Sequence, residues 1–423
     1  MEIPIRRKLL LWNANGRYSL NNPRRISFQW VMGGLFVLFS TIPWVHFGLT
    51  KMDSQPWPIL FSCFFLISLS SSLKYKKLLL TIAWLISLGI LTGLIYKPLA
   101  VDFLLFRGIA NYFGILFIFA SFIFFMQRYG FPLKILVFMN LIWLLAGVVQ
   151  IFFPLALESI VVGRTTIGRG VTSLAPEPTN FAMYLFFNSW LILIGKKYVL
   201  SSRIKFLVLL NFVGVIALAQ STMVVLFIVI TSITVGLYVF LRSSIKKRYF
   251  RLGILALVLG VISFIILINF FHESRLFHML HLASSLSWVE VFRVDASFNS
   301  RLAHVVLPII GFFHNYCLPG GFYSFASMSE KLVGFYDGYF WYGFSGDKIM
   351  SWVGSFLYEL GFFGFLIMFL IVKYINDSTR KRNFEIFLLF FLLFSAIPLA
   401  FPLIPMIMGA LYSTKFRIPK SHL

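Results

Sequence analysis

Residues 164–180 read RTTIGRGVTSLAPEPTN, a polar stretch with two arginines and one glutamate between two apolar runs. The chain as a whole is 59% hydrophobic, so it has little room for irregular polar segments. A bilayer tolerates such segments only outside the hydrocarbon or where they face a cavity. The stretch therefore predicts a membrane protein with a site that faces water at a membrane surface.

The composition of the remaining chain indicates a helical membrane protein. Only 12% of the 423 residues are charged, against about 25% in a soluble protein, and the mean hydropathy is +0.89. Repeated apolar runs of about 18 residues or more predict membrane-spanning helices. We predict an all-α polytopic protein with a cytoplasmic tail over residues 1–27, one transmembrane domain over 28–412 and a second cytoplasmic tail over 413–423.

The apolar runs place the expected spans along the chain. The last run, at 384–412, contains three prolines and predicts either one long kinked helix or a tight hairpin of two short helices. The runs before it lie at 28–48, 57–73, 78–95, 103–126, 135–154, 179–195, 206–220, 222–241, 252–271 and 350–372.

The basic residues set the expected orientation. The net charge of +23 comes from short clusters between the apolar runs, which is the positive-inside pattern of membrane proteins and not a nucleic-acid-binding face. Most of the 37 lysines and arginines fall on one side if both termini are cytoplasmic and the last run is a hairpin, which favours about twelve spans. Eleven spans stay open, because each arm of that hairpin is shorter than the ~20 residues of a full span.

Two loops on the outer side are expected to carry the function. The first covers about 155–178 and the second about 272–349, which is too long for a simple connector. Apolar residues near helical spacing between Glu273 and Arg293 predict that the second loop is partly helical. That helix either lies on the outer leaflet or packs on the bundle.

Arginines on the outer side are the first candidates for a binding site. Arg164, Arg169 and Arg301 lie in the two outer loops, where basic residues are disfavoured. A guanidinium group is a planar fork of donors that matches phosphate oxygens, although a loop arginine can instead pair with an acid of the same loop. Arg107 lies about one turn inside its span, where a charge either faces a cavity or reaches back to the interface.

Glu177 is the candidate general base. It lies between two prolines at the start of the sixth span, so its backbone is stiff and its carboxylate either accepts a proton or favours the start of the helix. Glu359 lies deeper, where a hydrogen bond between helices is expected. We find no nucleotide-binding, zinc-binding or hydrolase motif, so we expect no metal site and no cofactor.

Four polar segments follow one another in an order that a known family shares. They are residues 169–180 with their Glu-Pro-Thr, 220–222 at a tight outer turn, 300–301 followed by a Pro-Gly-Gly-Phe at 319–322, and 355–364. From about residue 160 to 370 the chain resembles the bacterial O-antigen polymerases (Wzy), while the first 150 residues match only in hydropathy. Some members have an arginine and a glycine at fixed spacing in both loops, and here only Arg301 to Gly311 fits.

The resemblance implies a metal-independent glycosyltransferase of the bacterial cytoplasmic (inner) membrane, with its site facing the periplasm or the exterior. Its donor and acceptor would be undecaprenyl-pyrophosphate-linked oligosaccharides, and a chain-length regulator and a flippase are candidate partners. Arg169 and Arg301 would stabilise the leaving pyrophosphate, and the attacking hydroxyl would lose its proton to Glu177, His304 or His314. The residues assigned to substrate binding are Arg164, Arg169, Arg301, Arg107 and Asn180.

Two rival functions stay open at this point. The related O-antigen ligases, which transfer the finished glycan to lipid A-core, typically have a histidine eleven residues before a Gly-x-x-Gly-like segment, and here that position is Met350. A carrier-lipid flippase or transporter would often show internal repeats and charges near the midplane. The chain has no visible repeat, and its polar features gather at one membrane face, so we expect surface chemistry.

Overall fold

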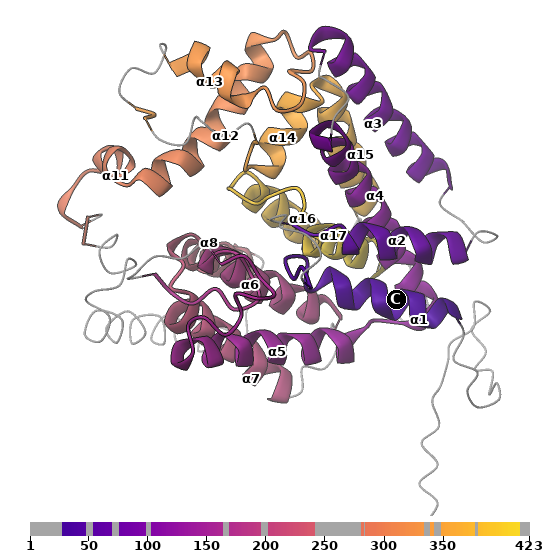
Figure 1. Cartoon of the computed structure of the whole chain (residues 1–423), viewed down its shortest axis with the longest axis vertical. Coiled ribbons are helices and arrows are strands. Elements are labelled where there is room, and N and C mark those ends of the chain that lie inside the picture. Colours follow the sequence, from indigo (N-terminus) through magenta and orange to yellow (C-terminus); the bar gives the residue numbers. More distant parts are fainter. Residues whose placement is uncertain are drawn as a thin grey trace, which may run out of the picture.

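The computed structural model describes residues 28–47, 54–69, 76–98, 103–163, 169–195, 202–241, 281–282, 284–333, 339–341, 348–376 and 380–414. Within these ranges the chain is helical and contains no strand, which confirms the all-α prediction (Figure 1). The elements are α1 (Phe28–Ser40), α2 (Trp57–Ser68), α3 (Lys76–Tyr96), α4 (Phe103–Tyr129), α5 (Leu133–Phe152), α6 (Pro178–Gly195), α7 (Ser202–Val213), the π-helix η1 (Gly214–Ala219), α8 (Thr222–Leu241), α11 (Trp288–Val294), α12 (Ala296–His314), α13 (Phe325–Val333), α14 (Trp352–Glu359), α15 (Phe362–Ile375), α16 (Arg380–Leu393) and α17 (Leu403–Thr414).

Three helices form the centre of the bundle. Every residue from Leu403 to Ser413 of α17 is buried, which is expected of a helix that is apolar all round. This helix packs mainly against α4 and α6, which are also largely buried, and Figure 1 shows it in yellow near the middle of the molecule. With twelve residues, α17 is about 18 Å long and too short to cross a bilayer alone.

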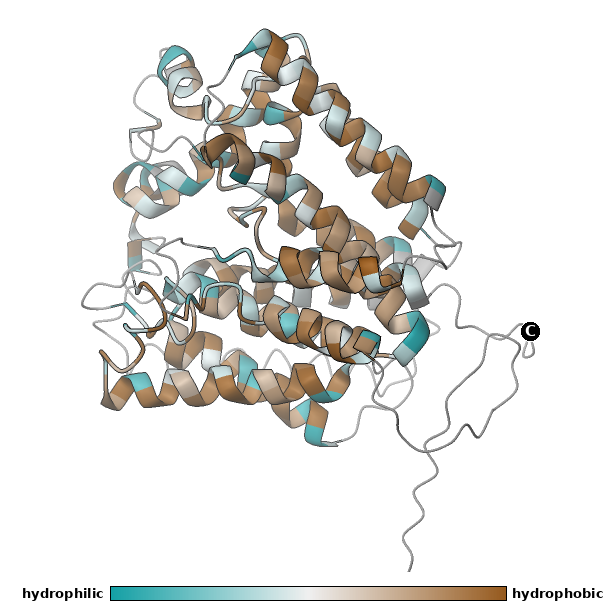
Figure 2. Ribbon diagram, turned by 45° about the vertical axis from the view of Figure 1, so that its right-hand side comes forward, coloured by the Kyte–Doolittle hydropathy of each residue, from teal (hydrophilic) through white to brown (hydrophobic). Residues whose placement is uncertain are grey.

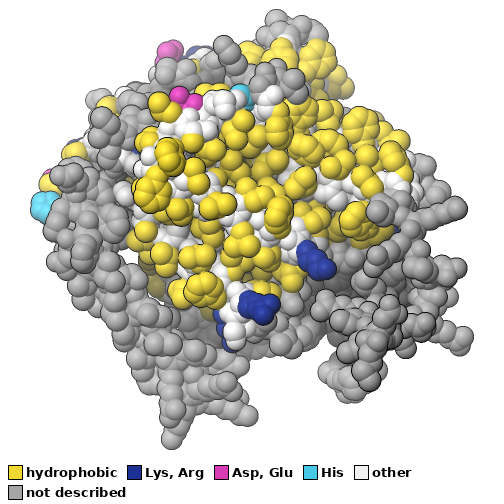
Figure 3. Space-filling view, turned by 60° about the horizontal axis from the view of Figure 1, so that its bottom comes forward, with side chains coloured by type: hydrophobic (Ala, Val, Ile, Leu, Met, Phe, Trp, Pro, Cys, Tyr) yellow, Lys and Arg dark blue, Asp and Glu magenta, His cyan; other side chains and the backbone are white. Residues whose placement is uncertain are grey.

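The outer helices present apolar side chains to their surroundings. Phe138, Leu145 and Phe152 of α5, and Leu80 and Trp84 of α3, are all exposed. Figure 2 shows brown, hydrophobic ribbon along the outer helices, and Figure 3 shows one face where hydrophobic side chains dominate and Lys and Arg lie near its edge. Surfaces of this kind are unfavourable in water and suit a bilayer.

Five helical segments among the described residues are long and apolar enough to cross a membrane, namely Lys77–Tyr96, Phe103–Tyr129, Leu133–Phe152, Ser202–Ala219 and Ala296–His314. The chain is therefore a helical membrane protein, while the number of eleven or twelve spans stays a prediction. The segment at Ala296–His314, which forms α12, lies within the predicted outer loop 272–349, so that loop contains a helix of spanning length that the sequence prediction did not include. The predicted tail at 1–27, the span at 252–271 and most of the tail at 413–423 lie outside the described residues.

Three of the predicted spans are interrupted. The run at 28–48 is helical only to Ser40, and the run at 384–412 forms two helices, α16 and α17, which excludes a single kinked helix. The run at 350–372 is divided into α14 and α15 at Gly361, where φ is +58°. A Cβ atom on Gly361 would lie 2.5 Å from the Pro319 nitrogen, so only glycine fits at this break. The prediction of a single continuous helix over 350–372 was wrong, because α14 ends before Gly361 and α15 begins after it.

The break between α14 and α15 is filled by the chain at 317–320. The Phe362 N–H donates to the Cys317 carbonyl at 2.8 Å, and the Gly320 N–H donates to the Tyr358 carbonyl at 2.7 Å. Irregular backbone inside a membrane protein needs such partners. Next to the break, the Tyr112 hydroxyl donates to the Glu359 carboxylate at 2.6 Å, which confirms the predicted hydrogen bond between helices.

The predicted outer loops are irregular where the structure describes them. Residues 153–163 form turns, and residues 169–177 contain no helix. In the second loop, residues 281–282 and 284–285 are helical, and Ser287 caps a separate helix, α11, so the predicted helix between Glu273 and Arg293 is interrupted before Ser287; residues 273–280 lie outside the described residues. The Ser287 side chain accepts from the Glu290 N–H, and its donation to the Glu290 carboxylate lowers the pKa of that group.

A cluster of buried amides joins α5, α6 and α7. Asn140 and Asn211 exchange two side-chain hydrogen bonds at 2.7 and 2.9 Å, and Asn188 donates to the same Asn140 oxygen at 2.8 Å. Asn211 also donates to the Ser189 hydroxyl at 2.7 Å. All three asparagine side chains are fully buried, so these bonds tie the three helices in a region without water.

We expect Asn140→Ala to destabilise the bundle by roughly 1–2 kcal/mol, because two buried amides lose their shared acceptor. The measurement is the apparent melting temperature of the purified protein in detergent. Ser87→Ala is the matched control, since the Ser87 hydroxyl is exposed and bonds to its own helix at Ala83. An equal melting temperature for Asn140→Ala and wild type would contradict a stabilising role of the cluster.

Candidate functional site

The loop 169–177 is held by one glutamine side chain. The Gln150 Oε1 atom accepts from the Thr172 N–H at 2.9 Å and from the Ser173 N–H at 2.7 Å. The Ser173 hydroxyl donates to the Trp143 carbonyl at 2.7 Å. Residues 172–176 are buried although they are not helical, so α5 supplies the partners that their own backbone cannot provide.

The same loop lies directly on the end of the π-helix η1. The Val171 N–H donates to the Leu218 carbonyl at 2.9 Å. A Cβ atom on Gly170 would lie 2.3 Å from that carbonyl oxygen, so only glycine allows the two backbones to come this close. Arg169 directly precedes this glycine, and Gln220 ends η1 with φ +49° and ψ +39°.

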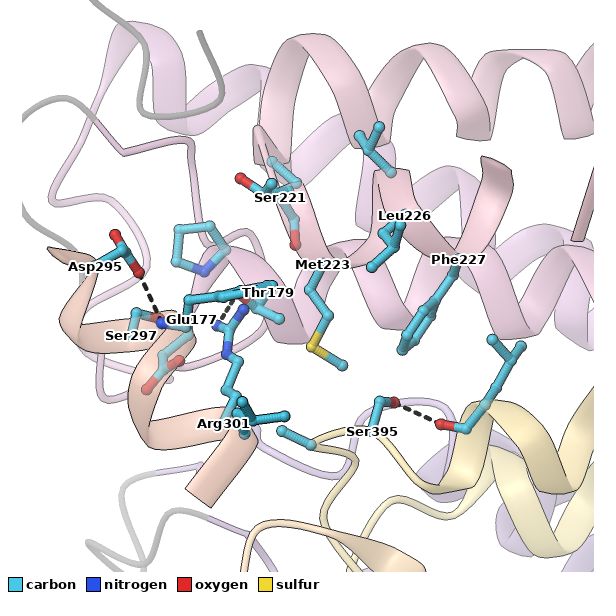
Figure 4. A pocket seen from close by; sticks show the side chains of 18 of the residues that line it. Glu177, Thr179, Ser221, Met223, Leu226, Phe227, Asp295, Ser297, Arg301 and Ser395 are labelled. Atoms are coloured by element: carbon cyan, nitrogen blue, oxygen red, sulfur yellow. Dashed lines mark hydrogen bonds between the residues drawn. The ribbon is translucent and has the colours of Figure 1, made fainter. Parts of the chain in front are cut away.

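The third part of the site comes from α12. Asp295 caps this helix by accepting from the Phe298 N–H at 2.7 Å. Less than two turns further on, the Arg301 Nη2 atom donates to the Thr179 hydroxyl at 3.0 Å. This hydrogen bond joins residues 122 positions apart and connects α12 to the first turn of α6 (Figure 4).

These segments enclose a cavity of about 480 Å³. Its polar lining comes from four places that are distant in the sequence: the loop with Arg169 and Glu177, the turn at 220–222, the start of α12 with Asp295 and Arg301, and Ser395 after α16. Figure 4 shows Glu177, Thr179, Asp295 and Arg301 together at one end of the cavity.

The other end of the cavity is apolar. Met223, Leu226 and Phe227 of α8 line it together with Phe391 of α16 and Phe394. Figure 4 shows the first three on the α8 side, away from Asp295 and Glu177. Leu226, Phe391 and Phe394 are also exposed at the molecular surface, so the apolar end is continuous with the outside of the bundle. The cavity therefore has a charged end and an apolar end.

Three of the predicted site residues meet in this cavity. They are Arg169, which is exposed, and Glu177 and Arg301, which are half-buried. No hydrogen bond joins the Glu177 carboxylate to another described residue, whereas its carbonyl accepts from the N–H groups of Asn180 and Phe181 at the start of α6. The carboxylate thus faces the cavity and leaves the start of the helix to the backbone.

The other predicted site residues that the structure describes do not line the cavity. The buried His304 ring stacks on Phe325 at 4.4 Å between centroids, and His314 is exposed at the far end of α12. Arg107 donates to the Ser54 hydroxyl at 3.4 Å. Asn180 lies beside Thr179 without lining the cavity. Arg164 lies outside the described residues. The assignment of these five residues to the site stays a prediction.

Sequence reasoning missed the partner of Arg301 and the apolar wall. Thr179 was part of the quoted polar stretch, but nothing in the sequence pairs it with an arginine 122 residues later. Met223, Leu226 and Phe391 read as ordinary span residues, because an apolar side chain that faces a cavity has the same pattern as one that faces lipid. The described residues contain no group of three or more His, Cys, Asp or Glu side chains that could hold a metal ion.

Comparisons of the chain with family models, with characterised proteins and with solved structures found no match. The function is therefore inferred from the geometry of the cavity and from the segments that line it.

We expect Gly170→Ala to destabilise the protein by about 1–3 kcal/mol, because the new methyl group overlaps the Leu218 carbonyl and forces the loop off η1. Thermal unfolding in detergent measures the change. Gly163→Ala, in the same predicted outer loop 155–178, is the control, since a Cβ atom there meets nothing within 4 Å. If both variants unfold at the wild-type temperature, the loop is not fixed by its contact with η1.

Proposed function

We propose that the chain is a membrane glycosyltransferase that polymerises undecaprenyl-pyrophosphate-linked oligosaccharide repeat units into O-antigen or a related surface polysaccharide. The observation that carries this proposal is the division of one cavity into a charged end and an apolar end. A polyprenyl pyrophosphate has the same division, with two phosphates at one end and a hydrocarbon chain at the other. The cavity lining also joins three of the four segments that resemble the O-antigen polymerase family.

In this proposal, the two arginines bind the pyrophosphate. A guanidinium group offers paired N–H donors to phosphate oxygens and keeps its charge at any physiological pH. Arg301 is oriented by its hydrogen bond to Thr179, and Arg169 by the glycine contact that fixes its loop. Their positive charge stabilises the pyrophosphate as it leaves the anomeric carbon.

Glu177 acts as the general base. The acceptor hydroxyl attacks the anomeric carbon of the donor sugar and gives its proton to the Glu177 carboxylate. The new glycosidic bond forms as the bond between that carbon and the pyrophosphate breaks, and undecaprenyl pyrophosphate leaves with the bonding electrons. The prenyl chain lies along Met223, Leu226 and Phe391. Leu226 and Phe391 are exposed at the molecular surface, so the chain can continue from the cavity into the bilayer.

The proposal places the site at the periplasmic or outer face of a bacterial inner membrane. A ligase is disfavoured because the position of its histidine is occupied by Met350, whose N–H donates to His304 away from the cavity. Transport is disfavoured because the charged groups gather at one end of the cavity and not along a path.

We expect Arg169→Ala and Arg301→Ala each to slow polymer formation by about 10²- to 10³-fold, a loss of roughly 2–4 kcal/mol of transition-state stabilisation. Purified protein in liposomes, supplied with undecaprenyl-pyrophosphate repeat units and neither ATP nor added metal, should build a ladder of products. Arg128→Ala is the control, since Arg128 lies in the last turn of α4 and does not line the cavity. A wild-type protein that builds no ladder, or that moves glycan only to lipid A-core, would contradict the polymerase function.

We expect Glu177→Gln to abolish most activity without loss of binding, because the amide keeps the shape of the side chain but cannot accept the proton. Thr179→Val should have a smaller effect, since it removes only the hydroxyl that orients Arg301. The two effects are separated by measuring kcat and the KM for the lipid-linked substrate. Wild-type kcat in Glu177→Gln would remove Glu177 from the reaction.

A further inference from the structure

Two aromatic side chains of the second loop lie on the surface beside the start of α12. Between them, Phe340 points inward and packs in a small core with Ala303, Leu307 and Met328. Its neighbours Tyr339 and Trp341 are 47% and 50% exposed. The buried Phe340 thus anchors a segment that presents two aromatic rings to the surroundings.

Hydrogen bonds fix the segment to α12 through one buried side chain. The Asn299 side chain, which is fully buried, donates to the Tyr339 carbonyl at 2.6 Å and accepts from the Trp341 N–H at 3.0 Å. The Trp341 indole N–H donates to the Arg293 carbonyl at 2.6 Å. The Arg293 guanidinium lies 4.6 Å from the centre of the Tyr339 ring. Both rings are therefore held in place before any ligand arrives.

The segment adjoins the charged end of the cavity. Arg293, which contacts both aromatic residues, is two residues from Asp295, which lines the cavity. Asn299, which holds the segment, is two positions from the cavity residues Ser297 and Arg301, so it points away from the cavity, towards the side of α12 where Phe340 packs on Ala303 and Leu307. A ligand whose phosphates lie at Arg301 reaches Trp341 by passing round the start of α12, where the Trp341 indole is bonded to Arg293.

We propose that Tyr339 and Trp341 form an aromatic platform that binds sugar rings of the glycan chain attached to the substrate. The proposal rests on the proposed function, because it assigns a place to the glycan outside the pyrophosphate site. The C–H faces of sugar rings stack on the electron-rich faces of aromatic rings, and fixed rings bind at a small entropic cost. Exposed Arg293 and Glu290 offer hydrogen bonds to the hydroxyl groups.

Anchoring in the outer interface of the bilayer is the other common use of exposed Tyr and Trp residues. An anchor needs no fixed orientation and directs the indole N–H towards lipid headgroups. Here the indole N–H is bonded to the protein, and Asn299 fixes the backbone on both sides of Phe340. These features favour a specific ligand.

The test is binding of a soluble glycan without lipid or pyrophosphate. The probe is the single repeat unit obtained by partial hydrolysis of the producing strain's surface polysaccharide, titrated into wild-type protein in nanodiscs. We expect saturable binding that Trp341→Ala weakens by about tenfold, the magnitude of one aromatic stacking contact. Trp341→Phe keeps a ring and should bind nearly as wild type. Phe313→Ala, at a more exposed aromatic residue of α12, should have no effect.

Three results would overturn the platform: no saturable binding by wild type, equal affinity in Trp341→Ala at normal thermal stability, or quenching of Trp341 by brominated lipid, which would identify a bilayer anchor.

The ladder assay separates failure of the platform from failure of the proposed function. A ladder from wild type, with an unchanged acceptor KM in Trp341→Ala, removes the platform alone. Glycan binding that depends on Trp341 without any ladder supports the platform and removes the polymerase.

Discussion

The whole site depends on satisfying the backbone of one non-helical loop inside an apolar protein. Residues 172–176 are buried, and a peptide group left without a partner in such surroundings costs several kcal/mol. Gln150 accepts two of their N–H groups, and the Leu218 carbonyl accepts that of Val171. These bonds fix the loop on α5 and η1, and the two ends of the fixed loop carry Arg169 and Glu177.

The fixed loop explains why a distant helix completes the cavity. Thr179 lies in the first turn of α6, two residues after Glu177, and its hydroxyl accepts a hydrogen bond from Arg301 of α12. Arg169 of the loop and Arg301 of α12 thereby line one cavity, where like charges repel unless an anion or an acid lies near them. Glu177 and Asp295 line the same end, so the formal charges of these four side chains sum to zero. In the proposed function, the apolar wall of α8 and α16 would contact the hydrocarbon chain of the ligand.

The sequence predicted the class of the fold and part of the site. The apolar runs predicted the helices, because burial in lipid or protein requires hydrogen bonds within each segment. The polar stretch at 164–180 predicted the loop, and the resemblance grouped Arg169, Glu177 and Arg301, which line one cavity in the structure. The break at Gly361 was not predictable, because it depends on a contact with Pro319 from another part of the chain. His304 is a polar residue in the predicted loop, but it packs against Phe325, and no local pattern encodes that contact.

The central claim is that Arg169 and Arg301 act together on one pyrophosphate, although one lies in the loop 169–177 and the other in α12. A double-mutant cycle tests it most directly, with initial rates of polymer formation measured for wild type, Arg169→Ala, Arg301→Ala and the double variant. Residues that act as one unit give strongly non-additive effects. The account predicts that the double variant is little slower than the slower single variant, with a coupling energy above about 1 kcal/mol. Losses that multiply, as for independent residues, would contradict a shared site.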